Sequence, residues 1–262
     1  MKLSEAKTLL SSAGIDSAAY DAAELFSHFC GYTRAALAAE DVSSDDPALL
    51  AAIARRCARE PLQYIIGRVF FYNEVYRVTP DCLIPRADTE RLVELALQHL
   101  PKNSHFADFC TGSGCIAIST LANRKDLTAA AVDLSEAALA LAKENAETNG
   151  VAERITFRQA DLLSAPALGR FDAILCNPPY IRTRDVAVLA PELAHEPSIA
   201  LDGGEDGLLF YKHLLSTYPD TFFLFEIGYD QGNDLLSLAK RHGRTAEVFK
   251  DYGGNDRVVS IK

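Results

Sequence analysis

The feature that most constrains the fold is a regular alternation of apolar and amphipathic segments, which starts after Asp88 and continues to the C-terminus. Apolar runs typical of strands occur at residues 106–110, 129–132, 155–157, 171–176 and 221–227, and near Glu247 and Val258. Helical patterns begin at Cys115 and occupy residues 136–149, 207–216 and 233–241. Alternating strands and helices build a mainly parallel sheet with helices on both faces. We therefore expect an α/β domain with a mainly parallel seven-stranded sheet, whose last two strands could form an antiparallel hairpin at one edge.

The first sixty residues are instead rich in alanine and helical in pattern. Apolar side chains share one helical face in two segments, which carry Ala18, Ala22, Leu25, Phe26 and Phe29, and Leu49, Ile53 and Cys57. Helix ends are expected at Gly14, at Gly31 and at Asp46-Pro47, where glycine, an N-capping acid and an N1 proline interrupt the pattern. These residues predict a small all-α N-terminal domain.

Between the two regions the residues become β-branched and aromatic around Asn73-Glu74, which predicts a hairpin. A chain of 262 residues is long enough for one α/β domain and one small helical domain. We therefore expect a helical domain at residues 1–66, a hairpin connector at 67–86 and the α/β domain at 87–262.

Composition limits the classes of partner and cofactor. The formal net charge of −10 argues against a large nucleic-acid interface and favours a basic protein partner. No apolar run approaches the roughly 20 residues of a membrane span, so we expect a cytoplasmic protein without a membrane partner. The six cysteines and six histidines are scattered, with neither Cys-x-x-Cys nor His-Glu-x-x-His, so disulfides, zinc and other metals are not expected.

A glycine-containing loop follows the first strand of the α/β domain and opens a helix. Its residues are Cys110, Thr111, Gly112, Ser113 and Gly114. Open α/β sheets bind nucleotides at this position, so the loop predicts a nucleoside cofactor. Ala117 stands where the dinucleotide motif has its third glycine, and because alanine is tolerated there, NAD is still a possible cofactor. The alternative without a ligand is a tight structural turn.

Acidic residues follow the next two strands of this domain. Asp133 ends the second strand about twenty residues after the glycines, where a carboxylate can accept the ribose hydroxyls. Its alternative role is that of an N-cap for the next helix, although Ser135 can serve as that cap. Asp161 and Leu162 follow the third strand, where they could contact an adenine ring. A solvated loop acid is an equally good reading of Asp161.

The most specific motif is Asn177-Pro178-Pro179-Tyr180, directly after an apolar strand. An amide nitrogen is a poor nucleophile, so an enzyme has to hold its N–H groups with acceptors and aim it at an electrophilic methyl group. The side-chain oxygen of Asn177 and the carbonyl of Pro178 can be those acceptors, and Tyr180 can stack on the flat acceptor group. Consecutive prolines fix the backbone and lack N–H donors, which holds the Pro178 carbonyl in place. Its alternative reading is a proline-stiffened turn.

Transfer from a sulfonium to such a nitrogen is an in-line displacement. The nitrogen cation that results is acidic enough to lose its proton to water, so no strong base is required. The catalytic residues expected from the motif are therefore Asn177, Pro178 and Tyr180.

At these residues the sequence resembles the HemK/PrmC family of release-factor glutamine methyltransferases over essentially its whole length. Besides the glycine loop and residues 177–180, the resemblance rests on four further segments: residues 61–67 (PLQYIIG), 83–90 (LIPRADTE), 226–228 (EIG) and 252–258 (YGGNDRV). Ala87 replaces a proline that is common in the family, and Leu162 stands where some members have an aromatic residue.

The resemblance implies a Rossmann-like class I methyltransferase domain that uses S-adenosyl-L-methionine. It also implies the substrate, the glutamine in the Gly-Gly-Gln loop of class-I peptide chain release factors, which is methylated at N5. Carried over by position, the implied cofactor contacts are Cys110 to Gly114, Asp133, Leu162 and Asn177, and Asn177 to Tyr180 form the implied glutamine site.

Three other functions are compatible with parts of the sequence. An adenine-N6 methyltransferase could present a flipped base to the same loop, but the chain lacks a basic, aromatic-rich recognition segment. A non-catalytic docking module would not need a complete cofactor loop with Asn177. An NAD-dependent reductase would need a proton relay that we do not find.

Several arginines have two possible roles. Arg55, Arg56 and Arg59 could form a small partner-binding patch, although a solvated helix face is the simpler expectation. Arg86 and Glu90 could frame the mouth of the site or form structural ion pairs. Arg182 and Arg184 could steer a substrate loop or lie solvated on the surface. Cys110 and Cys115 lack a histidine base and are expected to pack rather than react.

Overall fold

The computed structural model describes residues 1–262, which divide into two compact units. The first unit contains Met1–Arg68 together with the short segment Ala190–His195. The second contains Val69–Leu189 and Glu196–Lys262. The domain limits drawn from the sequence at residues 66/67 and 86/87 stay a prediction.

The first unit is a bundle of short helices. They are α1 (Leu3–Ser12), α2 (Ala18–Cys30), α3 (Arg34–Ala39), α4 (Pro47–Cys57) and α5 (Leu62–Ile66). Gly31 ends α2 in the left-handed conformation with φ of 73°, and the Asp46 side chain accepts the Ala48 N–H to cap α4 before Pro47. The expected apolar faces meet in one core, in which Phe29 is only partly buried. The helical character predicted from the sequence is confirmed.

The arginines of α4 and its C-terminal turn are paired. Arg56 is buried, and its Nε donates to Asp21 Oδ2 at 2.7 Å. Arg59 contacts Glu192, which belongs to the same unit, at 3.0 Å. Both readings given for these residues, an open basic patch and a solvated helix face, are therefore wrong for Arg56. A buried arginine without such a partner would lose its hydration without compensation.

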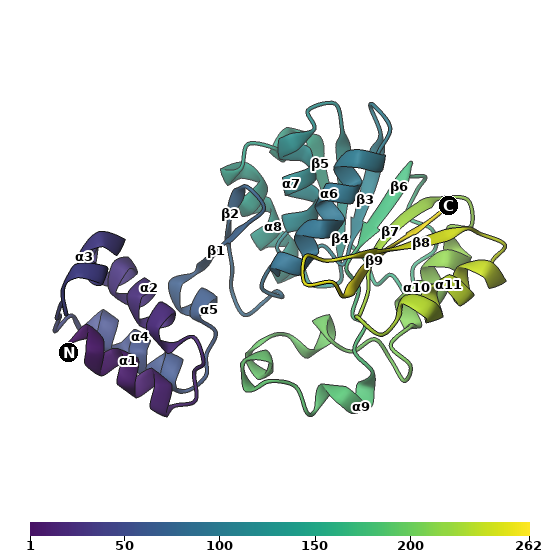
Figure 1. Ribbon diagram of the computed structural model, residues 1–262. Coiled ribbons are helices and arrows are strands. Elements are labelled where there is room, and N and C mark those ends of the chain that lie inside the picture. Colours follow the sequence, from purple (N-terminus) through teal and green to yellow (C-terminus); the bar gives the residue numbers. More distant parts are fainter. The chain divides into compact units, whose positions relative to one another are not determined.

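The second unit is built on a seven-stranded sheet (Figure 1). Its strands are β3 (His105–Phe109), β4 (Thr128–Asp133), β5 (Ile155–Gln159), β6 (Ala173–Cys176), β7 (Phe222–Glu226), β8 (Ala246–Lys250) and β9 (Asp256–Ile261). Their order is β5-β4-β3-β6-β7-β9-β8, and only β9 lies antiparallel to both of its neighbours. The predicted mainly parallel sheet with an antiparallel edge hairpin is confirmed.

Helices cover both faces of this sheet because successive strand residues point in opposite directions. In β3, Phe106 packs in the core with α6 (Glu90–His99), α7 (Cys115–Asn123) and α8 (Glu136–Thr148). Its neighbour Ala107 packs on the other face, with α10 (Leu209–Thr217) and α11 (Gly232–Arg241). Figure 1 shows these two groups of helices on opposite sides of the strands.

Strand β6 begins two residues later than predicted, at Ala173. Its ladder with β3 starts with the pair Phe106 and Ala173. The Phe171 ring packs edge-on against the Phe109 ring, with 5.8 Å between the centroids. The Asp172 carboxylate accepts the His105 N–H at 2.7 Å. The Asp172 N–H also donates to the His105 carbonyl at 2.9 Å, so backbone pairing with β3 already begins at the residue before β6.

The predicted hairpin is present as β1 (Arg68–Phe71) and β2 (Glu74–Arg77). Its buried Tyr76 shares a 2.6 Å hydrogen bond with Ser119 of α7. The Asn145 side chain of α8 accepts the Arg77 N–H and donates to the Arg77 carbonyl. These polar contacts fix the strand that leads towards the segment around residues 81–89.

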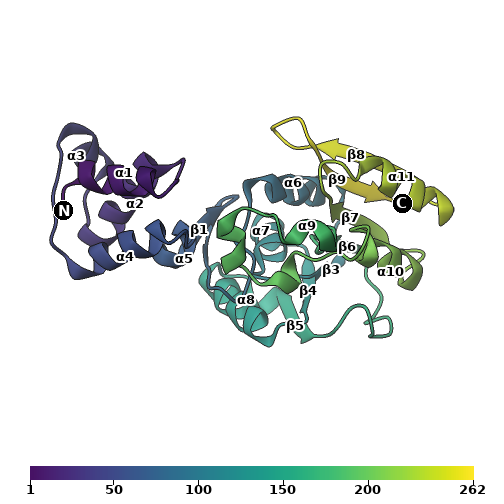
Figure 2. The same ribbon diagram turned by 90° about the horizontal axis from the view of Figure 1, so that it is seen from below.

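The second unit also contains two short helices that lie outside the main layers. The 3-10 helix η1 (Ala87–Thr89) precedes α6, and α9 (Thr183–Val186) follows β6. In Figure 2, which is seen from below, α9 lies in front of the strands. Further 3-10 turns occupy Ala152–Arg154, Pro191–His195 and Ser198–Ala200.

We expect the substitution Gly114→Ala to lower the free energy of unfolding by about 2–4 kcal/mol. Gly114 has φ of 83°, and a Cβ there would lie 2.8 Å from Ile118 Cδ1 and 3.1 Å from Ala142 Cβ. Gly150→Ala is the matched control, because Gly150 has φ of 70° but open space around it. It should cost only about 1 kcal/mol for the backbone conformation. Urea unfolding of both variants measures the difference, and equal losses would show that close packing at Gly114 is unimportant.

Candidate active site

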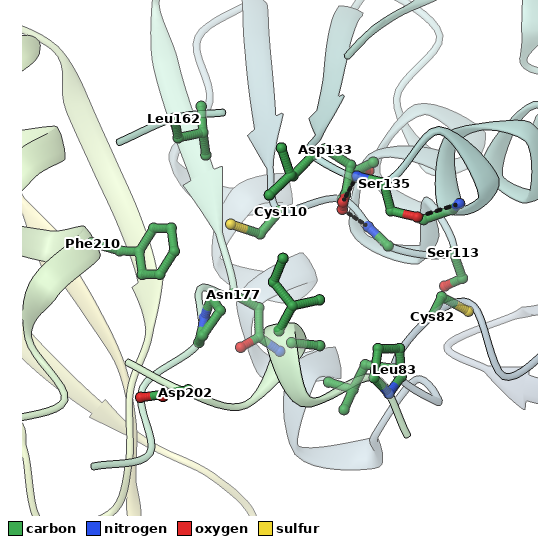
Figure 3. Close-up of a pocket in the computed structure, with 18 of the residues that line it drawn as sticks. Cys82, Leu83, Cys110, Ser113, Asp133, Ser135, Leu162, Asn177, Asp202 and Phe210 are labelled. Carbon is green, nitrogen blue, oxygen red and sulfur yellow. Dashed lines mark hydrogen bonds between the residues drawn. The ribbon is translucent and has the colours of Figure 1, made fainter. Parts of the chain in front are cut away.

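A cavity of about 560 Å³ lies at the carboxyl ends of β3, β4 and β6. This is where the strand order of an open α/β sheet reverses and where such sheets bind ligands. Most of the residues predicted for cofactor and acceptor binding line it, namely Cys110, Thr111, Gly112, Ser113, Asp133, Asp161, Leu162, Asn177 and Pro179. In the view of Figure 3, Asn177 lies between the side that carries Leu162 and Phe210 and the side that carries Asp133 and Ser113.

The glycine loop turns sharply out of β3. Cys110 and Gly112 both have positive φ, of 58° and 54°, and Gly114 begins α7 in the same region. A cysteine in this conformation is strained, whereas glycine adopts it freely. Gly114 does not line the cavity. A side chain there would instead meet Ile118 of α7 and Ala142 of α8, so glycine allows these two helices to pack closely. The sequence gives no sign that Cys110 is left-handed.

Asp133 connects the end of β4 to the glycine loop. Its Oδ2 accepts the Gly112 N–H at 2.8 Å, and its Oδ1 accepts the Ser135 N–H at 3.0 Å (Figure 3). Burial raises the pKa of this carboxyl, and the two backbone donors counteract that shift. Ser135 is the N-cap of α8, since its hydroxyl accepts the Ala138 N–H. Asp133 is therefore free of the capping role and presents its carboxylate to the cavity.

Asp108 fixes the same loop from the buried interior of the domain. It is fully buried, and its Oδ2 accepts the Thr111 hydroxyl at 2.6 Å and the Ala117 N–H at 3.1 Å. Its Oδ1 has no hydrogen-bond partner. Burial raises the pKa of Asp108 to about 7. This residue lies outside the cavity lining, so its role is to fix the shape of the loop.

The residues after β5 form a tight turn at one side of the cavity. Asp161 accepts the Leu163 N–H at 2.9 Å through Oδ1 and the Ser164 hydroxyl at 2.8 Å through Oδ2. The Ser164 hydrogen bond lowers the pKa of Asp161. Leu162 is buried and offers an apolar surface to the cavity.

The acceptor loop leaves β6 with its four residues in different surroundings. Asn177 and Pro179 line the cavity, whereas Pro178 is buried and Tyr180 lies outside the lining. The Tyr180 hydroxyl donates to Glu226 Oε1 at 3.5 Å, and burial raises the pKa of this tyrosine. The structure thus brings Asn177 to the cavity wall and ties Tyr180 to the end of β7.

A surrounding shell fixes the backbone of the acceptor loop. The buried Gln231 side chain donates to the carbonyls of Tyr180 and Gly207, each at 3.1 Å. At Gly203 and Gly207 the chain passes so close that a Cβ would lie 2.7 Å and 2.4 Å from atoms of Pro179 and Tyr180. These contacts fix the backbone of the acceptor loop in one conformation.

Several cavity residues were not predicted. Cys82, Leu83, Pro85 and the segment around Ser198–Ala200 line it, as does Phe210. Leu83 and Pro85 lie within the 83–90 motif, which is the sequence signal that could have indicated them.

Two of the arginines with two possible roles form ion pairs: Arg86, which could frame the mouth of the site, and Arg182, which could steer a substrate loop. Arg86 lines the cavity and pairs with the buried Glu196, whose Oε2 also accepts the Ile84 N–H at 3.2 Å. Arg182 pairs with Asp230 at 2.9 Å. The Glu90 carboxylate accepts the Tyr72 N–H at 2.9 Å. The ion-pair reading of Arg86 is confirmed, and the same pair holds the cavity wall together.

The cysteines of the cofactor turn differ in exposure. Cys115 is buried, and burial raises the pKa of its thiol, while Cys110 is partly exposed at the cavity. No group of three or more His, Cys, Asp or Glu side chains is arranged to hold a metal ion. None of the helices combines the length and the apolar character that crossing a membrane requires.

Comparison with known proteins places this site in a family. Residues 2–67 match the PrmC N-terminal domain, and residues 89–211 match the methyltransferase small domain. The chain is 40% identical to the release factor glutamine methyltransferase of Moorella thermoacetica, over 97% of this chain and 95% of that protein. It is 38% identical to the protein of the same name from Geobacter sulfurreducens, over 95% of this chain and 91% of that protein.

Solved structures share the fold at low identity. The catalytic domain of hMettl16 in complex with the MAT2A 3′UTR hairpin 6 has a TM-score of 0.60 at 16% identity, covering 93% of this chain and 91% of that one. The human methyltransferase 10 domain containing protein has a TM-score of 0.52 at 18% identity, covering 71% and 87%. The fold is that of a class I methyltransferase, and the chain belongs to the family of release factor glutamine methyltransferases.

Proposed function

We propose that this protein methylates the side-chain amide N5 of the glutamine in the Gly-Gly-Gln loop of class-I peptide chain release factors, with S-adenosyl-L-methionine as the donor. The observation that carries the proposal is the position of Asn177 and Pro179 on the same cavity wall as the glycine loop and Asp133. Relatives of nearly equal length that bear the name release factor glutamine methyltransferase support the substrate.

The residues of the cavity fit this donor. Its volume of about 560 Å³ lies within the usual range of small-molecule sites. Asp133 has both oxygens fixed by backbone donors and keeps further lone pairs for the ribose hydroxyls. Leu162 offers an apolar surface for the adenine ring, and Gly112 lets the backbone approach the donor closely. The further contacts proposed are those of Cys110, Thr111, Ser113, Asp161 and Asn177.

The bound donor supplies an electrophilic methyl group, and the protein's residues present the nucleophile. In the proposed geometry Asn177 Oδ1 and the Pro178 carbonyl accept the two N–H groups of the glutamine amide. These two hydrogen bonds orient the amide so that its nitrogen faces the methyl group, which fixes the line of attack. Tyr180 supports the loop from behind, since its hydroxyl is directed to Glu226. The proton that the new cation must lose goes to water, because a cation of this kind is acidic enough to lose it without a strong base.

The proposed partner is a protein rather than a nucleic acid or a membrane, and the proposed location is the cytoplasm. The net charge of −10 supports the choice of partner, since phosphate backbones require a basic surface. The surplus of carboxylates instead favours attraction to a basic protein.

Cofactor binding tests the role of Asp133. We expect Asp133→Asn to weaken the affinity for S-adenosyl-L-methionine about 10-fold, because a neutral amide is a weaker acceptor for two hydroxyls than a carboxylate. Isothermal titration calorimetry measures the affinity. The control for the loss of one negative charge is Asp16→Asn, because Asp16 is exposed. Unchanged affinity in Asp133→Asn would contradict the assigned contact.

Methyl transfer tests the function itself. Purified protein is incubated with methyl-labelled S-adenosyl-L-methionine and a class-I release factor, beside a release factor whose Gly-Gly-Gln glutamine is replaced. We expect label only on the intact factor, and a rate about 100-fold to 1,000-fold lower for Asn177→Ala, which removes one of the two acceptors.

Donor binding without label on any release factor would overturn the proposed substrate. Label that appears instead on adenine of DNA or RNA would favour the alternative acceptor. Donor binding without transfer to any of these acceptors would point to a docking role.

A further inference from the structure

The proposed chemistry requires a particular orientation of the Asn177 amide. Only Oδ1 can accept an N–H of the substrate, whereas Nδ2 would oppose it donor to donor. The two ends of an asparagine amide have nearly the same shape, so packing alone does not select between them. The selection has to come from hydrogen-bond partners on the protein side of the side chain.

The partner that the structure gives Asn177 is Thr89, which lies where η1 passes into α6 and also contributes to the cavity lining. Asn177 Nδ2 donates to Thr89 Oγ1 at 3.5 Å, and Thr89 is only 2% exposed. A hydroxyl can accept from one neighbour and donate to another. Thr89 therefore accepts from Nδ2 reliably only if its own proton is directed to a third group.

Glu226 is that third group. It ends β7 on the face of the sheet covered by α6, is 2% exposed, and lies beside the Thr89 hydroxyl, which lowers its pKa. Its Oε1 accepts the Tyr180 hydroxyl at 3.5 Å, while its buried Oε2 has no hydrogen-bond partner of ordinary geometry and is the atom left to accept the Thr89 proton. An ionised carboxylate only accepts hydrogen bonds, so the Thr89 proton points to Glu226.

We infer that Glu226 is a positioning residue that, through Thr89, holds the Asn177 amide with Oδ1 turned to the acceptor site. The inference rests on the proposed function for its consequence but on the three side chains for its geometry. Because the direction of each hydrogen bond fixes that of the next, the relay links a carboxylate outside the cavity to the atom that would contact the substrate.

The charge state of Glu226 then controls the relay. Burial raises the pKa of Glu226 to about 7, the Thr89 hydrogen bond and the Arg257 guanidinium lower it, and Asp88 raises it. The other titratable groups that face it are Tyr180, which donates to it, and Tyr211 and Cys115, whose own pKa values it raises.

Protonation reverses the direction of the relay. The acid can donate to Thr89, which can then donate to Asn177 and leave the NH2 group facing the substrate. Below a pH of about 7 the correct orientation is lost, so the rate of transfer falls as the pH falls.

The experiment measures kcat and KM for methyl transfer between pH 6 and 9, together with donor affinity. In the wild-type protein kcat should fall on the acid side of pH 7. Thr89→Val, which removes the hydroxyl, should lower kcat about 10-fold or more with donor affinity within about 2-fold of wild type. Thr89→Ser keeps the hydroxyl and should restore most of the rate.

Glu226→Gln provides the second variant, because its amide can either accept from Thr89 or donate to it. Its kcat should be lower at pH 8 and should no longer fall on the acid side of pH 7. Thermal unfolding and donor binding of each variant separate this effect from a loss of fold, and the wild-type profile with Thr89→Ser against Thr89→Val tests the relay even if Glu226→Gln does not fold.

Wild-type kcat in Thr89→Val would overturn the inference, as would an acid fall that persists unchanged in a folded Glu226→Gln protein. Failure of the proposed function is distinguishable, because the wild-type protein would then transfer no methyl group to any release factor. In that case the side-chain amide resonances of Asn177 report the relay in the donor complex. They should shift between pH 6 and 8 in the wild type and not in Thr89→Val, and equal behaviour of the two would overturn it.

Discussion

The parallel pairing of β3 with β6 is the interaction on which the site depends. Phe109 lies opposite Cys176 in this ladder, so the two strands end side by side. The glycine loop and the acceptor loop begin at the very next residues, and they meet at one cavity for that reason. A register shift of one residue would turn Asn177 away from the donor side, because side chains alternate between the two faces.

Buried polar groups then convert this placement into a fixed geometry. Asp108 holds the glycine loop through the Thr111 hydroxyl, Asp133 holds it through the Gly112 N–H, and Gln231 holds the Tyr180 carbonyl. On the opposite side Arg86 and Glu196 join the residues before α6 to those after α9. Such partly and fully buried networks are costly to disturb, because each broken partner leaves an unpaired polar group. The cavity is therefore largely formed before any ligand enters.

The sequence was sufficient to predict the layers of the fold, the order of most elements and the glycine-loop, acidic and acceptor-loop residues that line one part of the cavity. Strand and helix periodicity carries that information locally. It did not indicate that Arg56 is buried against Asp21, or that Cys110 is left-handed, since both depend on neighbours distant in the chain. Thr89 and Glu226 were within recognised motifs, but their relation to Asn177 exists only once β6, β7 and α6 are packed together. The roles of the cofactor and acceptor residues stay predictions.

The central claim is that Asn177 and Pro178 hold the acceptor amide. A crystal structure of the protein with the demethylated donor and a glutamine-bearing release-factor peptide tests it most directly. We expect the amide nitrogen of the glutamine to lie within hydrogen-bond distance, about 2.7–3.2 Å, of both Asn177 Oδ1 and the Pro178 carbonyl oxygen. A glutamine bound elsewhere in the cavity, or one that meets the NH2 group of Asn177, would contradict the claim.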